Sequence, residues 1–82
     1  MKYISFKELK FERNYHLLDL KMGAKGAAVW ELQKLLNANT DSIPQDGIFS
    51  LITTNRLKTF QENNGLFPSG EVDEKTLKAL IK

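Results

Sequence analysis

The sequence predicts an all-α protein, a small three-helix bundle with an N-terminal arm or short extra helix. Apolar residues recur at helical spacing in three segments, and clusters of Gly, Pro, Asn and Ser separate these segments. No stretch shows the alternation of a strand. At 82 residues the chain has the size of one domain. Each helix is too short to be stable alone, so the three apolar faces must pack together.

The first helix of the bundle is expected over about residues 27–37. Its core-facing positions follow the spacing i, i+3, i+4 and i+7 and are Val29, Leu32, Gln33 and Leu36. The polar stretch 38–48 predicts a loop. Inside it, Ile43 is expected to reach the core.

Two further helices follow. Ser50 is expected to cap the second one, with its hydroxyl accepting from a free amide of the first turn. Asn64 and Gly65 end this helix, because both residues tolerate the left-handed conformation. Asp73 is expected to cap the third helix, where its charge suits the helix dipole. The apolar faces comprise Thr53, Leu57, Phe60 and Gln61 in the second helix, and Leu77, Leu80 and Ile81 in the third.

The chain is expected to divide into an arm, residues 1–19, and a three-helix domain, residues 20–82. Ser5 and Glu8 match a capping box, which predicts a short helix from Ser5 to about Glu12. An ordered arm without a helix is the alternative. Tyr15, Leu17 and Leu18 are expected to lie back on the bundle.

A weak internal repeat links the second and third helices. In both copies a glycine, Gly47 or Gly70, is followed by an apolar residue at +2, a capping residue at +3, Thr at +6 and Leu at +10. A second echo relates Val29-x-x-Leu32-Gln33 to Leu57-x-x-Phe60-Gln61.

Composition excludes several classes of function. The chain has no Cys and one His, which excludes disulfides, thiolate zinc sites and cysteine nucleophiles, and no metal or cofactor is predicted. No carboxylate pair or catalytic triad is visible, so we expect no enzyme. A net charge of +2 is too small to predict nucleic-acid binding. No apolar run is long enough for a membrane span or a secretory signal.

Gln33 and Gln61 each allow two interpretations. They could recognise a ligand, but we favour amides that satisfy buried backbone groups of a loop, because buried polar groups need partners. Asp46 and Gly47 likewise favour a tight turn over a carbohydrate or metal contact.

Trp30 lies roughly 120° from the centre of its helix face. It could be an exposed plate on which a sugar ring stacks, or an anchor for a protein partner. The favoured interpretation is that it packs under the arm, against residues such as Tyr15 or Leu18, because large aromatic side chains are usually mostly buried.

The order of these elements resembles the peptidoglycan-binding domain with a three-helix fold that is common in bacterial and phage cell-wall hydrolases. The resemblance covers about residues 20–81. It departs from the family pattern at Trp30, Ser50-Leu51, Arg56 and Ser69. The matching motifs are Leu20-Lys21-Met22-Gly23-x-x-Gly26-x-x-Val29-x-x-Leu32-Gln33-x-x-Leu36-Asn37, Asp46-Gly47-x-Phe49 with Thr53, Leu57, Phe60-Gln61 and Gly65-Leu66, and Gly70-x-Val72-Asp73-x-x-Thr76-Leu77-x-x-Leu80.

The resemblance implies a non-catalytic module that anchors an attached hydrolase, or a phage or spore component, to the bacterial cell wall. The expected partners are peptidoglycan glycan or stem peptide and a linked catalytic domain. The expected location is the bacterial cell wall or the outside of the cell. If the protein belongs to a phage, the phage would deliver it there. The candidate ligand-binding residues, in a groove near the first two helices, are Trp30, Asn37, Asn39, Asp46, Phe49, Thr53 and Arg56. The alternative is a protein-interaction or assembly module on the same fold.

Overall fold

A computed structural model describes residues 5–40 and 42–82 of the chain. This part is helical, and it holds no strand beyond one isolated antiparallel bridge between Lys25 and Ile48. The all-α prediction is confirmed. The elements are α1 (Phe6–Arg13), the 3-10 turn η1 (Tyr15–Leu17), α2 (Ala27–Asn39), α3 (Leu51–Asn63) and α4 (Glu74–Leu80).

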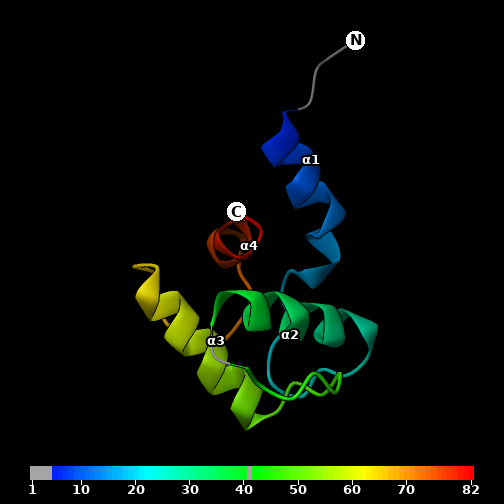
Figure 1. The fold of residues 1–82 in the computed structure, drawn as a ribbon, viewed down its shortest axis with the longest axis vertical. Coiled ribbons are helices and arrows are strands. Elements are labelled where there is room, and N and C mark those ends of the chain that lie inside the picture. The colour runs from blue at the N-terminus through cyan, green and yellow to red at the C-terminus, as the bar shows by residue number, and fades with distance from the viewer. Residues whose placement is uncertain (1–4, 41) are drawn as a thin grey trace.

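The core lies where α2, α3, α4 and η1 meet, while α1 projects from this body (Figure 1). The apolar side chains predicted for the three helix faces are buried there. Ile43 is buried with them, as predicted, and joins the loop after α2 to the core. The buried apolar residues are Leu17, Val29, Leu32, Leu36, Ile43, Phe49, Leu57, Phe60, Val72, Leu77, Leu80 and Ile81.

An irregular segment before α2, residues 19–26, connects two parts of the molecule that are distant in sequence. At one end it pairs with Val72, whose N–H donates to the Leu20 carbonyl over 2.9 Å. At the other end the Gly26 N–H donates to the Gly47 carbonyl over 2.8 Å. We call this segment the strap, because it binds the turn before α3 and the turn before α4 to the same piece of backbone.

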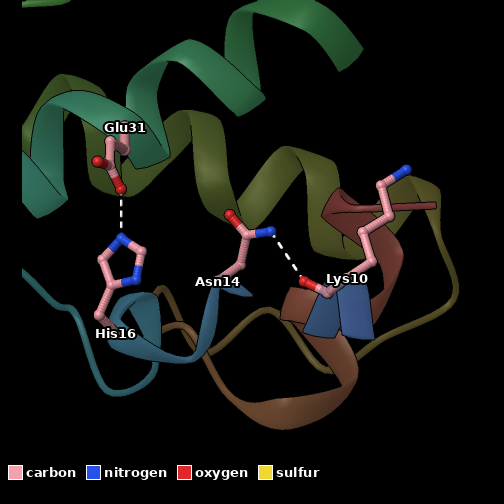
Figure 2. A network of polar contacts seen from close by, with 4 residues as sticks. All are labelled: Lys10, Asn14, His16 and Glu31. Atoms are coloured by element: carbon pink, nitrogen blue, oxygen red, sulfur yellow. Dashed lines mark hydrogen bonds and ion pairs between the residues drawn. The ribbon is translucent and has the colours of Figure 1, made fainter. Parts of the chain in front are cut away.

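The predicted short helix exists as α1. Its N-cap is Ser5, whose side chain accepts from the Glu8 N–H. At its other end, the Asn14 side chain donates to the Lys10 carbonyl (Figure 2). Of the residues expected to lie on the bundle, Leu17 is fully buried and Leu18 is half-buried against the core. The expectation for Tyr15 was wrong, because its ring is mostly exposed. The division of the chain at residue 19 stays a prediction.

The helix ends follow the sequence, with one correction. Asp73 caps α4 by accepting from the Thr76 N–H. The helix α3 ends at Asn63, with Asn64 as its C-cap and Gly65 in the left-handed region. Ser50 occupies the N-cap position of α3, but its side chain makes no capping bond, so the expected role of its hydroxyl was wrong. In the first turn of α3, Leu51 and Ile52 are exposed, whereas Thr53 and Thr54 are buried.

Leu17→Ala tests whether η1 is part of the folding unit. Because Leu17 is completely buried, the truncation should lower the free energy of unfolding by about 2–5 kcal/mol. Chemical denaturation measures the change. Tyr15→Ala, in the same turn but exposed, should change it by less than about 1 kcal/mol. Equal effects of the two variants would contradict the placement of Leu17.

Candidate functional site

The Gln33 amide holds the turn that precedes α3. Its Nε2 donates to the Ile48 carbonyl, to Asp46 Oδ1 and to Thr53 Oγ1, each at 3.0 Å. Its Oε1 accepts from the Gly47 N–H at 2.8 Å. Gln33 is fully buried, and its bonds to Thr53 and to the Gly47 N–H lie in the interior, whereas those to Asp46 and to the Ile48 carbonyl are part-buried. The structural interpretation of Gln33 is confirmed.

The Gln61 amide holds the turn that precedes α4 in the same way. Its Nε2 donates to the Glu71 carbonyl at 2.9 Å and to Thr76 Oγ1 at 3.0 Å, and also to Ser69 Oγ at 3.2 Å. Its Oε1 accepts from the Gly70 N–H at 3.0 Å. The weak sequence repeat is therefore a repeat of one hydrogen-bonded unit: a buried glutamine, a glycine turn and a buried threonine.

The Asp46–Gly47 turn is structural, as favoured. Gly47 has φ of +74°, and a Cβ at this position would lie 3.2 Å from the Gly26 carbonyl oxygen of the strap. The Asp46 carboxylate accepts from the Ile48 N–H at 3.0 Å. This backbone bond, with that from Gln33, lowers the pKa of Asp46 below its ordinary value of 3.8.

Two of the predicted site residues, Trp30 and Asn37, are seven positions apart and therefore lie on one side of α2. Trp30 is 44% exposed, with Lys34 Nζ 5.8 Å from its ring centroid. The expectation that Trp30 is buried under the arm was wrong. The neighbouring Glu31 contacts the arm instead, through His16 of η1 (Figure 2). The side chain of Asn37 makes two hydrogen bonds to Ile43. Its Oδ1 accepts from the Ile43 N–H, and its Nδ2 donates to the Ile43 carbonyl.

The other candidates are dispersed. Phe49 and Thr53 are buried to 1% exposure, so their side chains support the turn from below. Arg56 is half-buried on α3. Asn39 lies on the opposite flank of α2, where it donates to the Leu80 carbonyl at 3.5 Å and lines a hollow of about 340 Å³. The structure thus ties Asn37 to the loop that carries Asp46 and leaves Trp30 exposed on the same side of α2 as Asn37, whereas Asn39 lies on the opposite side.

Sequence reasoning missed one surface feature. Ile48, Leu51 and Ile52 are exposed at the start of α3, although all three are apolar. A comparison of the two repeats could have found them, because the second repeat has Glu71, Glu74 and Lys75 at the matching positions. A larger cleft of about 830 Å³, lined by residues of α1 and α4 that include Phe11, Lys78 and Ile81, lies away from the predicted site.

The described residues contain no group of three His, Asp or Glu side chains that could hold a metal ion. Within residues 5–40 and 42–82, no helix has both the length and the apolar character needed to cross a bilayer.

Gln33→Leu should lower the free energy of unfolding by about 2–4 kcal/mol, because it leaves the buried Gly47 N–H and its neighbours without partners. Gln61→Leu should cost a similar amount, since its bonds are equivalent. Denaturant titration measures both. Gln45→Leu, in the same loop as Gly47, is the control and should stay within about 1 kcal/mol of wild type. A small loss for either buried glutamine would show that its turn holds without the amide.

Asp46 should contribute to the acid sensitivity of the domain. Because its pKa is lower in the folded state, its stabilising effect is complete above 3.8 and is lost as pH falls through the lowered pKa. The difference in unfolding free energy between wild type and Asp46→Asn should therefore shrink in acid. Denaturation at a series of pH values, with NMR titration of the carboxyl carbon, measures this. A carboxyl titrating at or above 3.8 would contradict the hydrogen-bonded turn.

The arrangement of helices and turns is that of known proteins. The family model of the peptidoglycan binding domain matches residues 25–80, which contain both glutamine-held turns. The crystal structure of the SleB N-terminal domain is similar, with a TM-score of 0.73 and 35% identity over 79% of this chain and 90% of that chain. No protein of curated function matches the sequence. The match over most of the chain shows that it belongs to the family of peptidoglycan-binding domains, non-catalytic modules of cell-wall hydrolases.

Proposed function

We propose that this domain holds a linked hydrolase against the bacterial cell wall, by binding peptidoglycan without reacting with it. The observation that supports the proposal is the family match over residues 25–80, with the structural likeness to the SleB N-terminal domain. Binding by such a domain raises the local concentration of the linked enzyme at its substrate and needs no contact with the scissile bond. The wall itself, outside the cell membrane, is the place where the module would act.

The ligand face that we propose is centred on Trp30. Its exposed ring offers an apolar plate to the C–H face of a sugar, and its indole N–H offers a donor. Asn37 and Asp46 lie at the edge of this face, where their hydrogen bonds hold the loop 43–48 in position. Phe49 and Thr53 support it from the interior. We place Asn39 outside this face, because it lies on the other flank of α2.

Arg56 completes the proposed set. Arg56 is half-buried on α3, and the planar fork of its guanidinium suits a carboxylate of a stem peptide. A ligand that spans sugar and peptide would contact α2 through Trp30 and α3 through Arg56.

Co-sedimentation with insoluble peptidoglycan, at low and at high salt, tests the proposal. Wild type should pellet saturably at both, because a specific contact with a sugar ring is not screened as surface charge is. Trp30→Ala should weaken pelleting by about tenfold. Tyr15→Ala removes an exposed aromatic ring from η1 and should bind as wild type does.

Two results would contradict this proposal. Pelleting that disappears at high salt would mean only nonspecific attraction of charge. Absence of pelleting at either salt concentration would favour the alternative, a protein-interaction module on the same fold. Equal loss in Trp30→Ala and Tyr15→Ala would separately remove Trp30 from the ligand face.

A further inference from the structure

Three exposed apolar side chains gather at the start of α3, and we call them the apolar corner: Ile48, Leu51 and Ile52. They are 46%, 63% and 56% exposed, respectively. Ile48 ends the turn held by Gln33, and the two others form the outer side of the first helical turn, at the low end of α3 in Figure 1. Grouped apolar residues at a surface mark interaction sites more often than single ones do.

The internal repeat shows that the fold does not require this apolar corner. Glu71, Glu74 and Lys75 occupy the matching positions of the second repeat and are exposed there too. Each turn is held by a buried glutamine that makes equivalent hydrogen bonds, and each leads into a helix with a buried threonine. Since the same architecture accepts charged residues in one copy, the apolar residues of the other copy serve something other than folding.

The charges around the apolar corner are positive. Lys25 forms the antiparallel bridge with Ile48, and the side chains of such a pair lie together on one face of the ribbon. Arg56 lies one helical turn after Ile52, on the same side of α3. Segments 20–30 and 47–61, which build this region, contain no Asp or Glu, although the chain has 10. The carboxylate of Asp46, which precedes the second segment, accepts from Gln33 of α2 and from the Ile48 N–H.

From this juxtaposition we infer that the apolar corner, with Lys25 and Arg56, binds the peptide portion of peptidoglycan: short chains with small apolar side chains and free carboxylates. The methyl groups of alanine suit Ile48, Leu51 and Ile52, and the carboxylates suit the two cations. The N-acetylated sugars carry no charge that would match these cations. A second copy of the chain is disfavoured, because a symmetric contact would bring like charges together. This inference rests on the proposed function and names the part of the polymer that this surface recognises.

The test exchanges the apolar corner for its counterpart in the second repeat. The variant Ile48→Glu/Leu51→Glu/Ile52→Lys introduces residues that the same fold already carries at Glu71, Glu74 and Lys75, so thermal unfolding should show a folded domain. Its pelleting with insoluble peptidoglycan should be about tenfold weaker than that of wild type. Phe67→Glu, which adds a charge at a ring that is 80% exposed in another loop, should pellet normally.

Charge and ligand identity are tested separately. Lys25→Glu should weaken pelleting, whereas Lys75→Glu, the same change in charge on α4, should not. The free tetrapeptide L-Ala–γ-D-Glu–diaminopimelate–D-Ala should displace wild type from the wall.

The outcomes separate this inference from the proposed function. Failure of the wild-type domain to pellet contradicts the proposed function, and the inference with it. Wild-type pelleting that the triple variant retains, or that the tetrapeptide cannot displace, overturns the inference and leaves the proposed function standing. A wild-type dimer in sedimentation that the triple variant abolishes would also overturn it, because the apolar corner would then be a contact between copies.

Discussion

The hydrogen bonds of two buried glutamines are the constraint on which the rest of this small fold depends. A turn built on Asp46–Gly47 or on Ser69–Gly70 leaves backbone groups that face the interior. Gln33 and Gln61 supply the donor and acceptor that these groups need, and a threonine from the following helix shares the arrangement. The interior has a low dielectric constant, so such bonds are strong when complete and costly when broken. One side chain thus sets where a turn ends and the next helix begins.

The strap turns the two units into one body. Its backbone pairs with Val72 near one end and with Gly47 and Phe49 near the other, so both turns are fixed to the same segment. The close approach of Gly47 to the Gly26 carbonyl explains why a residue without Cβ stands there. Three helices of 13, 13 and 7 residues could not be stable separately, but they share a core that the strap and η1 close.

This division of tasks leaves the surface free to vary. Because the buried groups specify the turns, exposed positions beside them can carry charged residues in one repeat and apolar residues in the other. The basic side of the molecule and its exposed Trp30 are then available to a ligand without loss of the fold. A binding module needs this arrangement, in which buried groups hold the backbone rigidly and the exposed side chains can change to suit a ligand.

The sequence by itself determined the helices and the caps at Ser5 and Asp73, because helical periodicity and capping depend on neighbours along the chain. It also predicted the structural role of both glutamines, because a polar side chain at a core-facing position needs buried partners. Only the tertiary structure decided the rest. Whether Trp30 is exposed depends on where the arm runs, and the arm contacts α2 through His16 and Glu31 instead. Which of the candidate site residues share a side depends on how the loop 43–48 folds against α2, a contact between residues distant in sequence. The exposure of a side chain and its distance from residues far away in sequence depend on how the elements pack, so they cannot be predicted from one segment alone.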